Sequence, residues 1–249
     1  MKFSKAVKDT FIISWIKSYP DFKRNPLTLV LVVVISSAPL FFMALGGGQN
    51  AVVNGLIGAM VSSVAFRGVT AGITDIYWDR YVKIREMITA MPVAPASYAL
   101  GVALAPLIIS VPSLIFFGVL AAYLGFLTLN ALMMVVVSLI VVWAAVSTMG
   151  FMISTYLLKS SWVVLNNLST LLGLIVIFIP PVYYSEAQLG ALSWLSIIVP
   201  TSNVAGLMRS YMGLLPLPMS VVLIRWLVLA ATTIFFIALT IRKARWQEK

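Results

Sequence analysis

Residues that could carry out acid–base or metal chemistry are scarce in this sequence. It contains no histidine and no cysteine, and only 7 of its 249 residues are aspartate or glutamate. Nucleophile–base pairs and the common metal sites are built from these residue types. We therefore expect no catalytic residue, no metal site, no cofactor bound by this chain and no enzyme activity of its own.

The charged residues gather instead in one short stretch, DRYVKIREMITAMPVAP at residues 79–95. Its first eight residues hold two acids and three bases, and two prolines close it. As a helix over about 76–91, it would carry an apolar stripe with charges on its other faces. The stripe consists of Tyr77, Tyr81, Ile84, Ile88 and Met91. Periodicity alone fits a docking helix and a solvated loop equally well.

The rest of the sequence has the composition of a protein that lies within a lipid bilayer. Hydrophobic residues make up 61% of it, charged residues 10%, and the mean hydropathy is +1.05. Such a chain has too little polar surface to cover a soluble core. A helical crossing needs about 20 apolar residues. This length predicts six transmembrane helices, at 27–45, 51–73, 98–123, 128–157, 163–180 and 219–241.

The N-terminal residues 1–24 predict an amphipathic helix. Apolar and aromatic side chains recur every four residues from Phe3 to Tyr19, with lysines between them. This pattern is typical of a helix that lies in the membrane interface. A helix packed on a soluble domain would look similar, but no soluble domain is predicted here. Pro20 and the Asn25-Pro26 step are expected to end the helix and turn the chain.

Segment 181–218 differs from the predicted spans. Its apolar run, 189–199, is too short to cross a bilayer, and prolines interrupt the segment. We expect one or two short re-entrant or interfacial helices on one face of the membrane.

The basic residues are unevenly distributed in this topology. With the N-terminus inside, 14 of the 17 lysines and arginines fall in the cytoplasmic segments, and one, Arg209, falls on the opposite face. This asymmetry predicts that both termini are cytoplasmic. It also accounts for the net charge of +10 without nucleic acid, which we do not expect as a partner.

The order of these segments resembles the permease subunits of type-2 ABC transporters, a family that contains drug, polysaccharide and lipid exporters. REMITAMPVAPASYALG at 85–101 is similar to the family's stretch after its second span. IVPTSNVAGLMRSYM at 198–212 is similar to its segment before the last span. The layout corresponds to one all-α membrane domain over 1–249: an interfacial helix at 1–24, five spans within 27–180, an extracytoplasmic re-entrant segment at 181–218, a sixth span at 219–241 and a cytoplasmic tail at 242–249.

The resemblance implies a role for the charged stretch. In this family the helix after the second span is a cytoplasmic coupling helix seated on a separate ATPase subunit, which binds ATP and Mg²⁺. The residues that would make this contact here are Tyr81, Ile84, Arg85, Glu86, Ile88, Met91 and Pro92. The sequence has no GxxxxGK[ST] phosphate loop of its own. We expect an exporter permease in a prokaryotic plasma membrane, paired with a second permease copy as a homo- or heterodimer.

Polar residues inside the second and fifth predicted spans are candidates for a substrate path. An amide in hydrocarbon is costly without a partner, so these side chains are expected to face protein or a cavity. The resemblance places both spans along the path between subunits, whereas ordinary interhelical hydrogen bonds would explain any single residue equally well. The path candidates are Asn54, Ser62, Ser63, Asn166, Asn167 and Thr170, and the outer-gate candidates are Tyr183 and Tyr184. Gly68 and Gly72, four residues apart, would allow close helix packing.

The alternative function is an ion-coupled secondary transporter or channel. Proteins of that kind usually carry an ionisable residue within a span. The predicted spans contain no acid, because Asp75 and Asp79 fall at a cytoplasmic boundary and Glu186 on the outer face. This pattern favours ATP-driven export.

Overall fold

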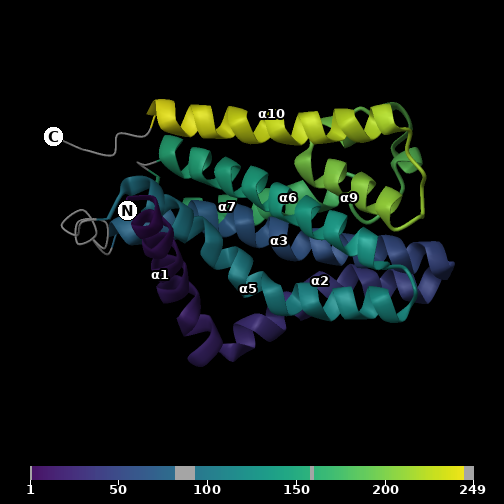
Figure 1. The fold of residues 1–249 in the computed structure, drawn as a ribbon, viewed down its shortest axis with the longest axis horizontal. Coiled ribbons are helices and arrows are strands. Elements are labelled where there is room, and N and C mark those ends of the chain that lie inside the picture. The colour runs from purple at the N-terminus through teal and green to yellow at the C-terminus, as the bar shows by residue number, and fades with distance from the viewer. Residues whose placement is uncertain (1, 82–92, 158–159, 244–249) are drawn as a thin grey trace.

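The computed structural model describes residues 2–81, 93–157 and 160–243. Within these ranges the chain is a bundle of helices with no β-strand (Figure 1). Most of the predicted coupling helix lies outside the described residues, including Ile84, Arg85, Glu86, Ile88, Met91 and Pro92. The end of the predicted cytoplasmic tail, 244–249, lies outside them as well.

In the part of the chain that the structure describes, five helices are long and apolar enough to cross a membrane. They are α2 (Pro26–Gly46), α3 (Gly48–Tyr81), α5 (Pro95–Tyr123), α6 (Leu129–Tyr156) and α10 (Met219–Lys243). The fifth predicted span forms a shorter apolar helix, α7 (Trp162–Phe178), of 17 residues. At 1.5 Å per residue it is about 26 Å long, slightly less than the hydrocarbon core of a bilayer. The fold is that of a multi-pass membrane protein, with five of the six predicted spans reaching spanning length.

Local sequence sets many of the helix starts. Proline occupies the first helical position of α2, α5 and α9 (Pro200–Tyr211), where its missing N–H breaks no hydrogen bond. The hydroxyls of Thr128 and Ser161 cap α6 and α7, and accept from backbone N–H groups at 3.3 and 3.4 Å.

Two helices run past a predicted boundary. The first, α1 (Lys2–Lys23), has the predicted extent and ends just before the Asn25-Pro26 step, but Pro20 lies inside it and does not end it. Pro20 lacks a donor, but its carbonyl accepts from the N–H groups of Arg24 and Asn25 at 2.8 and 3.0 Å, which closes one more turn. The second is α3, which is continuous over 34 residues. Residues 76–81, predicted to start a separate coupling helix, are the last turns of α3.

Helix α3 forms the centre of the bundle. It packs against α2, α5, α6 and α7, as the ribbon shows (Figure 1). Of its most apolar stretch, 78% is buried inside the chain, compared with 11% for α2 and α10. Leu56, Ile57, Met60 and Ile73 of α3 are among the largest fully buried side chains. The polar residues in the middle of α3, Ser62 and Ser63, are therefore buried within this chain.

Glycines bring α3 and α6 close together. A methyl group on Gly150 would lie 2.8 Å from the carbonyl oxygen of Val69 and 3.0 Å from Cα of Gly72. Gly68 meets Val146 in the same way, at 2.6 Å. The close packing expected at Gly68 and Gly72 is therefore made against α6.

The predicted re-entrant segment contains no helix of spanning length. It holds the 3-10 helix η1 (Glu186–Leu192), the short α8 (Leu195–Ile198) and α9. α9 packs among α3, α6 and α10, and its residues 201–209 are all buried. α9 thus forms part of the protein core at the end of the bundle away from α1, whereas η1 is largely exposed (Figure 1).

Candidate functional site

α1 docks on α5 through a narrow face of small hydroxyl residues. Thr10, Ser14 and Ser18 recur every four residues, are buried, and donate to backbone carbonyls of α1 itself at 2.9 Å. On α5, a methyl group on Gly101 would lie 2.7 Å from the side chain of Ile13 and 2.9 Å from the Thr10 carbonyl oxygen. Small residues on both helices therefore allow this close approach.

The opposite face of α1 carries its aromatic stripe outward. Phe11 and Trp15 are 60% and 55% exposed, and Val7, Ile12, Ile16 and Tyr19 are also exposed. An apolar stripe beside lysines, with a polar seam against the bundle, is the arrangement expected of a helix in the membrane interface.

A buried carboxylate ties α1 to α3 and α5. Lys17 of α1 donates to one oxygen of Asp79 on α3, and the hydroxyl of Tyr98 on α5 donates to the other. Asp79 is 1% exposed, so both contacts are made away from solvent. Lys17 and Asp79 are 62 residues apart in sequence, and no local pattern indicated that they would meet.

A cleft of about 670 Å³ opens beside this contact, between α1, α3 and α5. Its ionisable lining residues are Asp9, Lys17, Asp21, Arg67, Asp75 and Asp79. Arg67 and Asp75 lie eight residues apart on one face of α3, and among the residues that the structure describes no hydrogen bond reaches either side chain. The charges that act on Asp75 are those of Lys17, Asp79, Arg67 and Asp21.

Two of these acids, Asp75 and Asp79, are the ones expected at the cytoplasmic boundary of the second span. Both belong to the last turns of α3, a helix long and apolar enough to cross a membrane. The sequence prediction ended the span at residue 73, where the apolar run stops, although the helix continues. An ionisable residue within a spanning helix is a candidate functional residue. The described residues contain no group of three acidic side chains arranged to hold a metal ion.

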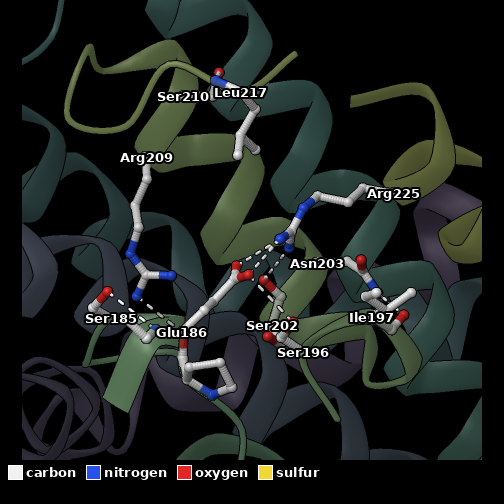
Figure 2. A network of polar contacts seen from close by, with 12 residues as sticks. Ser185, Glu186, Ser196, Ile197, Ser202, Asn203, Arg209, Ser210, Leu217 and Arg225 are labelled. Atoms are coloured by element: carbon white, nitrogen blue, oxygen red, sulfur yellow. Dashed lines mark hydrogen bonds and ion pairs between the residues drawn. The ribbon is translucent and has the colours of Figure 1, made fainter. Parts of the chain in front are cut away.

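A second polar cluster lies near the other end of α3. Figure 2 shows Glu186 of η1 reaching toward Arg225 of α10, with Arg209 of α9 on its other side. Nη2 of Arg225 donates to the two carboxylate oxygens of Glu186 at 2.6 and 2.7 Å. Ser196 donates to the same carboxylate at 3.2 Å.

Arg209 binds the backbone of the residues that lead into η1. Its Nη2 donates to the carbonyls of Pro181, Val182 and Tyr184 at 3.0, 2.9 and 2.8 Å. Its Nε donates to Oδ1 of Asn54 at 2.6 Å, so this path candidate is engaged within the chain. Burial lowers the pKa of Arg209 to about 10, while Glu186 opposes this shift. The guanidinium therefore stays charged at neutral pH.

Three more candidates meet inside the bundle. Burial raises the pKa of Tyr183 to about 12, so its hydroxyl stays protonated and donates to Ser62 at 2.7 Å. Its ring stacks on Phe178, with centroids 5.7 Å apart. Ser62 and Ser63 are both buried and donate to carbonyls of their own helix. None of the three borders open space outside the chain.

The remaining candidates are separate from these. Tyr184 donates to the carbonyl of Ile179 at 2.5 Å. Asn166, Asn167 and Thr170 of α7 are exposed, and Thr170 donates to the Asn166 carbonyl at 3.0 Å. α7 packs mainly on α3, and no other described helix covers the face that carries these three residues. The structure thus divides the predicted path into a buried group on α3 and an outward group on α7.

No protein-family model matches this chain, and no curated protein matches its sequence. The arguments for its function therefore come from the chemistry and arrangement of its residues.

Proposed function

We propose that this chain is the membrane-spanning permease subunit of an ATP-driven exporter of the type-2 ABC kind. In this proposal, two permease copies form the substrate path between them, and a separate ATP-binding subunit drives transport. The order of segments supports it: an amphipathic α1, a charged stretch after α3, and short helices before the last span. The observation that carries it is the outward amide face of α7.

The amides on α7 need a partner that the described residues of this chain do not supply. Asn166 and Asn167 are exposed on a helix whose mean composition is strongly apolar. An unpaired amide facing lipid is unfavourable by one to several kcal/mol, roughly. A second copy of the chain, with a polar path between the two α7 helices, would provide hydrogen-bond partners or water for these groups.

The packing around α3 supports a path between copies over a path within one chain. Its polar residues Asn54 and Ser62 have partners inside the chain, and large apolar side chains fill the space around them. The family resemblance implied that the second and fifth spans both line the substrate path. Because α3, the second span, lies at the centre of the bundle, the proposed path is lined by α7, the fifth.

The proposed topology has six crossings, with α7 as the fifth and both termini in the cytoplasm of a prokaryotic cell. A helix of 17 residues can cross where the bilayer thins or where flanking residues extend it. The distribution of lysine and arginine supports this orientation, with 14 of 17 on the cytoplasmic side.

Cysteine crosslinking tests the dimer path. The chain contains no cysteine, so single substitutions need no further background changes. Asn167→Cys should crosslink two copies in native membranes. Ser169→Cys, buried against the bundle at 1% exposure, and Leu223→Cys, 51% exposed on α10, serve as controls and should stay monomeric. Dimers from Leu223→Cys with none from Asn167→Cys would place the interface elsewhere.

Coupling to an ATPase has its own test at Glu86, which lies outside the described residues. A like charge at a docking surface can cost several kcal/mol. Glu86→Lys should therefore reduce both co-purification with the ATPase and permease-stimulated ATP hydrolysis, without lowering the amount of permease in the membrane. Unchanged complex and unchanged hydrolysis in Glu86→Lys and Ile84→Asp would rule out the coupling role.

One observation favours the alternative of an ion-coupled transporter or channel. Arg67 and Asp75 border a cleft within the spanning part of α3, where such proteins carry their ionisable residues. Purified chain in proteoliposomes, with no ATPase present, would then show a proton or cation flux that Asp75→Asn abolishes. A flux equal to that of empty vesicles would exclude this alternative.

A further inference from the structure

The cleft between α1, α3 and α5 has a long apolar wall. Ile12, Ile13 and Ile16 of α1 line it together with Ile109 of α5 and Trp78 of α3. Its volume of about 670 Å³ lies within the range of small-molecule sites. An apolar wall of this size suits the body of a hydrophobic or amphipathic ligand.

The charged lining of the cleft is unbalanced. Among the lining residues that the structure describes, four aspartates face one lysine and one arginine, which gives these residues a formal charge of −2. The lysine, Lys17, is already bound to Asp79. Arg67 lies near two carboxylates, Asp21 and Asp75, which both act on its charge. An anion placed against these described residues would therefore meet more carboxylates than cations.

We propose that this cleft binds an amphipathic cation, with its charge beside Asp75 and Asp21 and its apolar body against the isoleucines of α1. The face of an indole ring such as that of Trp78 also attracts cations. The site is separate from the amide face of α7 and does not depend on the proposed exporter function. It lies beside the aromatic stripe of α1, so a ligand dissolved in the membrane interface would reach it without crossing the bilayer.

Two ions of equal size and opposite charge test this proposal. The probes are tetraphenylphosphonium and tetraphenylborate, measured by equilibrium dialysis against the full-length chain in a non-ionic detergent, with empty micelles subtracted. Tetraphenylphosphonium should bind saturably and tetraphenylborate should not. Saturable binding of tetraphenylborate with equal affinity, or no saturable binding of the cation, would overturn the proposal.

Two substitutions in the cleft should act in opposite directions. Asp75→Asn keeps the shape of the side chain and removes one negative charge, so cation affinity should fall about tenfold. Arg67→Gln removes the competing positive charge, so affinity should rise about threefold or more. Unchanged affinity in both variants, or weaker binding in Arg67→Gln, would contradict the assignment.

Gln188→Ala on η1, an exposed residue that does not line the cleft, is the matched control and should bind the cation as the unmodified chain does. Each variant is compared as a monodisperse peak in gel filtration. If Asp75→Asn does not fold, the sign of the Arg67→Gln effect decides the matter, because general damage to the fold would weaken binding and not strengthen it. Since no ATPase is present, failure here leaves the exporter proposal standing.

Discussion

Arg225 and Glu186 form an ion pair across 39 residues of sequence, in which a single guanidinium nitrogen reaches both carboxylate oxygens. The Arg225 side chain is 4% exposed and the Glu186 side chain 23%. The pair fastens η1 to the start of α10 (Figure 2). It therefore holds the segment of short helices against the last spanning helix.

Removing the acid from this pair should destabilise the protein. Glu186→Gln leaves Arg225 buried with its charge unpaired, at a cost of about 1–3 kcal/mol, reduced from the fully buried case because Glu186 is partly exposed. The midpoint of thermal unfolding in detergent, followed by tryptophan fluorescence, should fall. Gln188→Ala, an exposed neighbour on η1, should leave it unchanged. An equal midpoint in both variants would contradict the structural role of the pair.

The contact between α3 and α6 should not tolerate a methyl group. In Gly150→Ala the new carbon would press on the backbone of Val69 and Gly72, and overpacking of this kind costs about 1–3 kcal/mol. Gly118→Ala on α5 is the matched control, since a methyl group there has no atom within 4 Å. It should leave stability unchanged or raise it slightly through helix propensity. Thermal unfolding of the two variants in parallel checks this, and equal stability would argue against the close contact.

Loss of the ion pair at Asp79 should loosen α1. Lys17→Met removes a cation from a buried carboxylate, and a loss of about 1.4 kcal/mol in local stability corresponds to roughly tenfold faster amide exchange. Hydrogen–deuterium exchange of peptides from residues 2–23 measures the effect. Lys8→Met, an exposed lysine on the same helix, is the control. Equal exchange in the two variants would show that packing on α5 alone holds α1.

The proposed orientation predicts labelling at Ser185, which is exposed at the start of η1. Ser185→Cys in intact cells should react with a membrane-impermeant thiol reagent, because the segment faces outward in this topology. Cysteine at Lys5, on the opposite side, should react only after the membrane is permeabilised. The reverse pattern would invert the topology.

Much of the fold could be predicted from the sequence because its signals are local. Apolar runs of about 20 residues predict the spanning helices, and prolines and hydroxyl caps mark where many of them begin. The ends were less predictable. α3 continues past residue 73 because helical hydrogen bonds persist when the side chains turn polar, so hydropathy alone marks the end of the apolar run and not of the helix.

The candidate site was less accessible from sequence because its contacts are long-range. Lys17 with Asp79, and Arg225 with Glu186, come together only when the bundle packs. One signal was present: Arg67, Arg209 and Arg225 interrupt apolar sequence, and an arginine there requires carboxylates or carbonyls nearby. Which groups supply them depends on the three-dimensional arrangement. Burial was equally hard to predict: Ser62 and Asn167 are both polar residues on apolar helices, but Ser62 is buried inside the protein and Asn167 is exposed.

α3 is one continuous helix that links the two polar clusters of the protein. Asn54 holds Arg209 near one end, and Asp79 holds Lys17 near the other, 25 residues further along the same helix. At 1.5 Å per residue these anchor points are about 38 Å apart, more than the depth of the hydrocarbon layer. No proline, 3-10 turn or bulge interrupts the helix between them. A tilt imposed on α3 by α1 at one end would therefore move the Arg209 cluster near the other end, because the helix does not bend between them.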